Sequence, residues 1–180
     1  MRKRSFLSGL FLISCFPLSA SAQIDCSNLP QWVTLSNNVL FNQIHVFCGE
    51  YSGNKPKGFH SRPGDSTPST VASFTVQDPA NAAGIYTGKW AYTGHTNQTK
   101  FSSMYPDACS QAQVLNSIAY ASSHPVSCPS GAPSWVKCGN NRPNPLNGDT
   151  GDYCNKDGEL FTIGYAPPQN NKINTAFPLR

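Results

Sequence analysis

The sequence has few charged residues and lacks the motifs of several common enzyme classes. Charged residues make up 12% of the 180 positions, and neither end of the chain carries an acidic or basic tail. No two carboxylates stand in a convincing paired setting for glycosidase chemistry. The G-x-S-x-G nucleophile elbow of serine hydrolases is also missing. The residue pattern therefore supports neither of these two classes.

The cysteines lack the close spacing of a metal site. No two of them are separated by the few residues that zinc sites use, and His124 is the only histidine near them. Six of the seven lie after residue 22: Cys26, Cys48, Cys109, Cys128, Cys138 and Cys154. In an exported chain, six cysteines predict three disulfides, and spacing alone does not choose the pairing. A zinc site is the weaker interpretation.

The chain also lacks an apolar run long enough to span a bilayer. Residues 1–22 begin with three basic side chains, continue with an apolar run broken by Ser14 and Pro17, and end in small residues. This pattern predicts a secretory signal peptide cleaved near Ala22, not a membrane anchor. Three of the 13 Lys and Arg but none of the 9 Asp and Glu lie in it, which leaves a net charge of +1. Any RNA binding must therefore depend on a local cationic cluster.

The remainder, residues 23–180, has the length of a single domain with mixed secondary structure. Residues 110–122 are predicted to be a helix, because Ser110 and Gln113 have capping-box spacing and apolar residues recur on one face. A shorter helix is expected over residues 35–44, starting at Ser36 or Asn38. The β-branched and aromatic segments are expected to be strands: 69–76, 84–92 and 159–166. Residues 124–158, rich in cysteine, proline and glycine, are expected to form a loop insertion stapled by disulfides.

Two histidines and a lysine are the candidates for catalysis. His45 and His60 flank a glycine-rich segment that can fold back on itself, and Lys100 follows later in the chain. Facing imidazoles can act as general base and general acid on a phosphodiester, and a lysine can stabilise the charge that develops on phosphorus. Taken alone, this set is weak evidence, because any chain with 4 histidines contains some such combination.

Three segments change this assessment. They are IHVFCGEYSGNKPKGFHSRP, KFSSMYPDACSQAQVLNSIAYA and INTAFPL. In this order they resemble the signatures of bacterial EndoU endoribonucleases: a histidine loop ending in G-F-H-S, a lysine before a turn and helix, and a C-terminal strand. The resemblance covers most of the chain from about Phe41 onward. It implies an α+β fold in which two small antiparallel sheets flank a catalytic cleft, with one or two packed helices.

The resemblance also assigns roles to individual residues. It makes His45 the general acid, His60 the general base and Lys100 the phosphate-stabilising cation, and it leaves an exchange of the acid and base roles open. Ser103 matches a residue that helps to select uracil. Thr175 and Phe177 border the base pocket, although many relatives have tyrosine where this chain has Phe177. Relatives cut on the 3′ side of uridines and leave a 2′,3′-cyclic phosphate.

The other candidates have simpler interpretations. Lys89 is the alternative to Lys100 for the cationic role, but it lies in a strand-like segment. Glu50 is expected to position the His45 loop by a local hydrogen bond. His95 and His124 lie in polar contexts and are expected to be exposed.

The sequence thus predicts a secreted or periplasmic endoribonuclease of single-stranded RNA, with no membrane association after signal cleavage. No metal site or cofactor is expected, although Mn²⁺ stimulation is compatible with the resemblance. The enzyme would serve as a toxin held by an immunity protein or as a scavenging nuclease. Two alternatives stay open: an inactive RNA-binding or adhesion module on the same framework, and a disulfide-rich inhibitor or structural domain.

Overall fold

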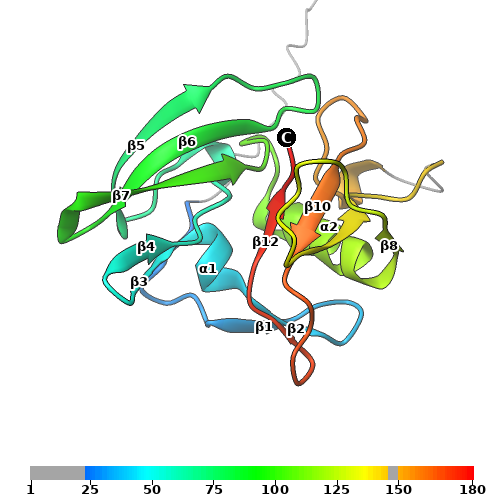
Figure 1. The fold of residues 1–180 in the computed structure, drawn as a ribbon, viewed down its shortest axis with the longest axis horizontal. Coiled ribbons are helices and arrows are strands. Elements are labelled where there is room, and N and C mark those ends of the chain that lie inside the picture. The colour runs from blue at the N-terminus through cyan, green and yellow to red at the C-terminus, as the bar shows by residue number, and fades with distance from the viewer. Residues whose placement is uncertain (1–22, 146–149) are drawn as a thin grey trace, which may run out of the picture.

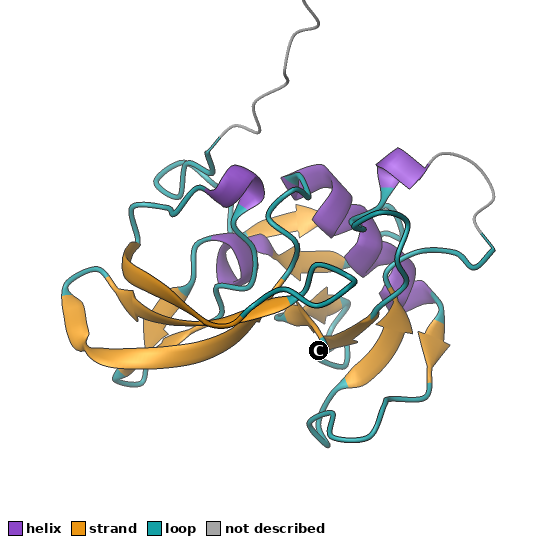
Figure 2. Cartoon of the chain, turned by 90° about the horizontal axis from the view of Figure 1, so that it is seen from above, coloured by secondary structure: helices purple, strands orange, loops and turns teal. Residues whose placement is uncertain are grey.

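The fold is built around two antiparallel sheets that lie on opposite sides of the molecule. The computed structural model describes residues 23–145 and 150–180. The first sheet contains β5 (Val71–Asp78), β6 (Tyr86–Tyr92) and β7 (His95–Met104). The second contains, in spatial order, β12 (Ala176–Pro178), β10 (Thr162–Tyr165), β9 (Lys137–Asn140) and β8 (Pro125–Val126). Figure 1 shows the first sheet in green and the second in red to yellow, and Figure 2 shows them at opposite ends from above.

Two smaller sheets and the helices complete the described part of the chain. The third sheet holds β1 (Trp32–Thr34), β2 (Leu40–Asn42) and β11 (Lys172–Ile173), the last parallel to β2. The fourth is the hairpin of β3 (Glu50–Ser52) and β4 (Lys55–Lys57). The helical elements are α1 (Gln43–Phe47), α2 (Gln111–Ser123) and the 3₁₀ turns Pro63–Asp65 and Thr150–Asp152. The predicted α+β class with antiparallel sheets is confirmed.

The helix predicted over residues 110–122 is confirmed as α2. Ser110 caps it, since its side chain accepts from the Gln113 amide and the Gln113 side chain accepts from the Ser110 amide. The most deeply buried face is centred on Val114 and Ile118, slightly offset from the expected stripe. This face packs on the second sheet. At Gly139 of β9 a side chain would collide with the Ala121 carbonyl, so glycine is required for this close approach.

The helix predicted over residues 35–44 is wrong in its position. Leu35 and Val39 pair across a tight turn between β1 and β2, and Asn38 there has a left-handed φ of 62°. The helix starts only at Gln43, where the Asn42 side chain accepts from the His45 amide. The capping asparagine therefore comes four residues later than Asn38, and the preceding residues form a hairpin.

Each large sheet covers its own group of buried side chains. Phe59, Trp90 and Met104 form the centre of the group under β5, β6 and β7. The larger group joins α1 and α2 to the second sheet and includes Phe41 and Ile163. Because the two groups are separate, the edges of the two sheets meet without a continuous core between them.

All six cysteines after residue 22 form disulfides: Cys26–Cys48, Cys109–Cys154 and Cys128–Cys138. This pairing excludes the zinc interpretation and fits an oxidising compartment. The tract 124–158 contains β8 and β9 in its described residues, so it contributes strands as well as loops. The predicted signal peptide lies outside the described residues. Within those residues, no helix is long and apolar enough to cross a membrane.

Candidate active site

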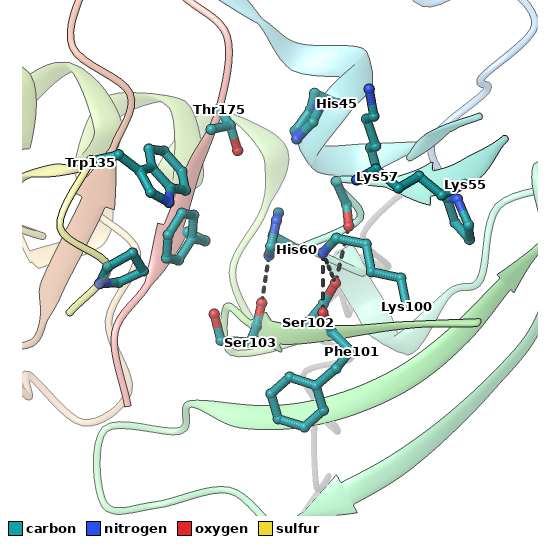
Figure 3. Close-up of a pocket in the computed structure, with 14 residues that line it drawn as sticks. His45, Lys55, Lys57, His60, Lys100, Phe101, Ser102, Ser103, Trp135 and Thr175 are labelled. Carbon is teal, nitrogen blue, oxygen red and sulfur yellow. Dashed lines mark hydrogen bonds between the residues drawn. The ribbon is translucent and has the colours of Figure 1, made fainter. Parts of the chain in front are cut away.

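A cleft of about 670 Å³ lies where β7 of the first sheet approaches β12 of the second. All six residues singled out from the sequence line it: His45, His60, Lys100, Ser103, Thr175 and Phe177. Figure 3 shows the labelled side chains arranged around one space, with Lys55, Lys57 and Lys100 on one side and Trp135 on the other. The fold thus brings together residues that are far apart in the sequence.

His45 is held by helix α1 and by a carboxylate. Its ring is buried, and its Nδ1 lies 2.6 Å from Oε2 of Glu50. Because a carboxylate only accepts, Nδ1 carries the proton and Nε2 is left for the cleft. The pKa of the Glu50 carboxyl is lowered, mainly by this hydrogen bond. Glu50 therefore orients the His45 ring, as expected.

His60 is fixed through its backbone and its ring. Its amide donates to the carbonyl of Val46 (2.8 Å), and its carbonyl accepts from the amide of Tyr105 (2.8 Å). Nδ1 donates to the carbonyl of Ser103 at 2.9 Å, which leaves the lone pair on Nε2. Burial, together with the nearby charges of Lys100 and His45, holds the pKa of His60 well below its ordinary 6.5.

The two imidazoles face one another across the cleft. Their ring centroids are 6.3 Å apart with an interplanar angle of 28°. Gly58 allows this approach: its φ is +72°, and a Cβ atom there would lie 1.9 Å from the His45 carbonyl oxygen. Across residues 23–145 and 150–180, neither Nε2 has a hydrogen-bond partner. Both atoms are therefore free to exchange protons with a bound molecule.

Lys100 supplies a positive charge beside this pair. Its Nζ donates to Oγ of Ser102 at 2.7 Å and to the carbonyl of Phe101 at 3.2 Å, as the dashed lines in Figure 3 show. The Ser102 hydroxyl in turn donates to the carbonyl of Gly58 at 3.0 Å, which ties Lys100 to the histidine loop. Burial lowers the pKa of Lys100 to about 8.

The register between β6 and β7 distinguishes Lys100 from Lys89, the other candidate for the phosphate-stabilising cation. Lys100 lies opposite the buried Trp90, whereas Lys89 lies opposite the exposed Phe101. Directly opposed residues share a face, and neighbours along a strand alternate between faces. Lys89 is exposed on the opposite face of the central strand β6 and does not line the cleft.

Aromatic rings form the wall opposite the lysines. The Phe177 ring lies 5.3 Å from the His60 ring, nearly parallel to it, and Trp135 lies 5.8 Å from Phe177. Thr175 is buried beside them, and Ser103 borders the floor from β7. Flat apolar surfaces next to hydrogen-bonding groups suit a nucleobase.

Several lining residues were not identified from the sequence. Lys55 and Lys57 of β4 join Lys100, so three lysines border the cleft although the net charge is small. Pro133 and Trp135 come from the loop closed by Cys128–Cys138. A tryptophan within a proline- and glycine-rich segment was the available signal for Trp135, since such a loop has no core of its own to bury it.

The remaining two histidines are exposed, as predicted. His124 is the C-cap of α2, and its ring stacks on Tyr120. His95 begins β7, where it stacks on Tyr51 at a centroid distance of 3.6 Å. Among the described residues, no three His, Cys, Asp or Glu side chains are grouped so as to hold a metal ion.

The cleft thus combines two opposed imidazoles, a partly buried lysine and an aromatic wall. These are the groups that an acid–base enzyme needs for an anionic, base-containing substrate. A model of the family described as Bacterial EndoU nuclease matches residues 41–180, and the chain belongs to this family. Membership supports an endoribonuclease. Comparisons with curated proteins and with solved structures find no match.

Proposed function

We propose that the protein is a secreted endoribonuclease that cuts single-stranded RNA on the 3′ side of uridines and leaves a 2′,3′-cyclic phosphate. One observation carries the proposal: the unpartnered Nε2 atoms of His45 and His60 face the same cleft beside the ammonium group of Lys100. This is the set of groups that in-line transesterification at phosphorus requires.

His60 is the general base. Its lowered pKa keeps it neutral at physiological pH, and its Nδ1–H bond to Ser103 presents the Nε2 lone pair to the substrate. Nε2 accepts the proton of the ribose 2′-hydroxyl. The resulting oxygen attacks phosphorus and forms the cyclic product.

His45 is the general acid. Its carboxylate partner Glu50 holds Nδ1–H, so Nε2 is the ring atom from which a proton can be transferred to a bound substrate. As the bond from phosphorus to O5′ breaks, this proton goes to O5′ of the departing nucleotide. The contrast between the two environments supports this assignment over the exchanged one.

Lys100 stabilises the negative charge that builds up on the non-bridging oxygens. Its Nζ is held in place before the substrate arrives by Ser102 and the Phe101 carbonyl. A preorganised charge in a partly buried site is effective because it needs no rearrangement during the reaction.

The base pocket is assigned to Ser103, Thr175 and Phe177. Phe177 offers a ring for stacking, and the Ser103 hydroxyl is a hydrogen-bonding group that lines the same cleft. Phenylalanine lacks the hydroxyl of the tyrosine in many relatives, so the selection of uracil depends mainly on Ser103.

The compartment limits the biological roles that fit the proposed activity. The three disulfides support export, and an exported ribonuclease is suited to act as a toxin or effector. Such an enzyme would have an immunity protein as partner in the producing cell. A scavenging nuclease is the alternative with the same chemistry, and an inactive RNA-binding or adhesion module is the alternative without it.

The proposal is tested with the mature protein and an oligoribonucleotide that contains a single uridine. We expect one cut after the uridine in a buffer containing EDTA, with a 2′,3′-cyclic phosphate detected by mass spectrometry. All roles in the reaction are filled by side chains, so a chelator is expected to leave turnover intact. Added Mn²⁺ should at most improve RNA binding.

Two different outcomes would contradict the proposed function. No cleavage despite RNA binding would identify the inactive module. If turnover at saturating RNA disappears in EDTA and one metal ion restores it, the acid–base roles of His45 and His60 are wrong and a metal-ligand role replaces them.

The state of Lys100 predicts a decline of activity in alkali. With a pKa of about 8, Lys100 is charged below this pH and loses its charge as the pH rises through it. His60 stays neutral to well below pH 6.5, so protonation of His60 should lower kcat/KM only at pH values well below 6.5. We expect kcat/KM, which reports groups of the free enzyme, to fall above about pH 8.

The matched variant is Lys100→Arg, because arginine keeps its charge at any accessible pH. Whatever its absolute rate, its alkaline decline should move to higher pH. An alkaline limb at the same pH in both proteins would show that Lys100 does not cause it.

A further inference from the structure

A second groove borders the catalytic cleft at Trp135. It measures about 650 Å³ and includes Trp32, Trp135, Gln169, Asn170, Lys172 and Asn174 among its lining. Trp135 lines both spaces, so its indole forms the wall that they share. The groove therefore lies next to the active site, with the Trp135 indole between the two.

The indole of Trp135 is presented by a closed loop. The disulfide Cys128–Cys138 joins the ends of this loop, and Cys138 is anchored in β9. The side chain is 52% exposed, one of the few large apolar groups on the surface of the described residues. An exposed indole on a covalently closed loop is a preorganised stacking surface, since little conformational freedom is lost on binding.

The opposite part of the groove pairs a second indole with a cation. Nζ of Lys172 in β11 lies 4.9 Å from the ring centre of Trp32 in β1. Lys172 is exposed and makes no ion pair within the described residues, so its charge is available to a phosphate. Indoles, amide side chains and one lysine match the base, polar edge and phosphate of a nucleotide.

Hydrogen bonds place this groove on the His45 side of the active site. The Asn42 side chain donates to Oδ1 of Asn174, which lines the groove, at 3.0 Å. The same amide donates to Oε1 of Glu50, the carboxylate that holds His45. The proposed acid protonates O5′ of the departing nucleotide, so the chain that follows the cut leaves the cleft on this side.

We propose that this groove is the binding subsite for the nucleotide immediately downstream of the cleaved bond. Its base stacks on the indoles of Trp135 and Trp32, and the phosphate on its 3′ side contacts Lys172. The assignment rests on the proposed function, because it takes the direction of the RNA from the roles of His45 and His60. A nucleotide is favoured over a protein ligand because the groove borders the catalytic cleft at Trp135.

The experiment compares two chimeric oligonucleotides, each with one ribouridine as the only cleavable position. One carries four deoxyadenosines downstream of the uridine. The other carries four upstream and ends downstream in a single abasic deoxyribose, which supplies the leaving O5′ but offers the subsite neither a base nor a 3′ phosphate. For the wild-type protein, kcat/KM should be higher on the downstream-extended substrate. Trp32→Ala should lower the downstream-to-upstream ratio of kcat/KM by about tenfold, the effect of losing one stacked base. Lys172→Ala should lower the same ratio through loss of the phosphate contact.

Matched controls separate binding from folding. Trp32→Phe keeps an aromatic ring and should restore most of the ratio, whereas Lys89→Ala removes an exposed lysine outside both grooves and should leave the ratio as in the wild type. A structural defect would lower the rates on both substrates together and leave their ratio unchanged, which would overturn the proposal for that residue.

A binding measurement keeps the subsite and the function distinguishable. The same two oligonucleotides are made with 2′-deoxyuridine, labelled with a fluorophore, and titrated with wild type and variants in an anisotropy assay. Weaker binding of the downstream-extended strand alone by the variants supports the subsite, even if wild type cuts neither substrate and the proposed function fails. Equal losses of affinity for both strands, or a loss for the upstream-extended strand alone, would overturn the subsite assignment.

Discussion

Replacement of the 2′-hydroxyl of the cleaved uridine by hydrogen is expected to abolish cleavage. The nucleophile in the proposed reaction is the substrate's own 2′-oxygen, and the role of His60 is to remove its proton. Without that oxygen no cyclic phosphate forms, whatever the quality of the site. The measurement uses one oligoribonucleotide with a single uridine, compared with the same strand containing 2′-deoxyuridine at that position.

The control tests whether the strand with 2′-deoxyuridine still binds to the protein. The deoxy strand should compete with the cleavable strand, with an inhibition constant close to the KM, because the stacking and phosphate contacts assigned here do not involve the 2′-hydroxyl. Cleavage of the deoxy strand at a comparable rate would mean that water or another nucleophile attacks phosphorus, and the roles given to both histidines would have to be abandoned.

Local signals in the sequence were sufficient for part of the fold. The capping box of α2 needs only Ser110 and Gln113, four residues of chain and no tertiary contact, and it was predicted correctly. The hairpin between β1 and β2 depends instead on a left-handed Asn38 and on pairing between short strands. Neither of these leaves an apolar periodicity, so a helix was predicted in its place.

The long strand β7 shows where sequence periodicity fails. Its first half, from His95 to Thr99, is polar and exposed on both faces, so no alternation marks it as a strand. It is a strand because β6 supplies hydrogen-bond partners along its length. Lys100 and Ser102 owe their common direction into the site to this pairing.

The candidate catalytic residues were predicted by resemblance. Their spacing in the sequence could not identify them, because they meet only through tertiary contacts. His45 and His60 meet because Gly58 permits a backbone contact with His45 that no other residue tolerates. The wall formed by Trp135 depends on a disulfide between Cys128 and Cys138, and the pairing of six cysteines cannot be read from their order. The cationic cluster of the cleft likewise depends on the β3–β4 hairpin folding toward β7.

Alanine substitution of His60 is expected to lower kcat by at least about a hundredfold, the usual contribution of a positioned general base. His60→Ala removes the imidazole whose Nε2 lone pair, left free by the Nδ1–H bond to Ser103, is proposed to accept the 2′-hydroxyl proton. His45→Ala and Lys100→Ala should have effects of the same order, through loss of the acid and of the charge stabiliser. Single-turnover rates on the uridine oligoribonucleotide measure these effects without interference from product release.

Controls for these variants come from the same chain. His95→Ala and Lys89→Ala remove a histidine and a lysine that are exposed outside the cleft, and both should retain activity within about twofold of the wild type. Thermal unfolding followed by circular dichroism shows whether His60→Ala, which also loses a hydrogen bond to Ser103, is still folded. Free imidazole added to a folded His60→Ala protein should restore part of the rate, because it can occupy the vacated space and accept the proton. A silent Lys100→Ala together with an inactive Lys89→Ala would move the cationic role to Lys89 and contradict the register argument that places Lys100 in the site.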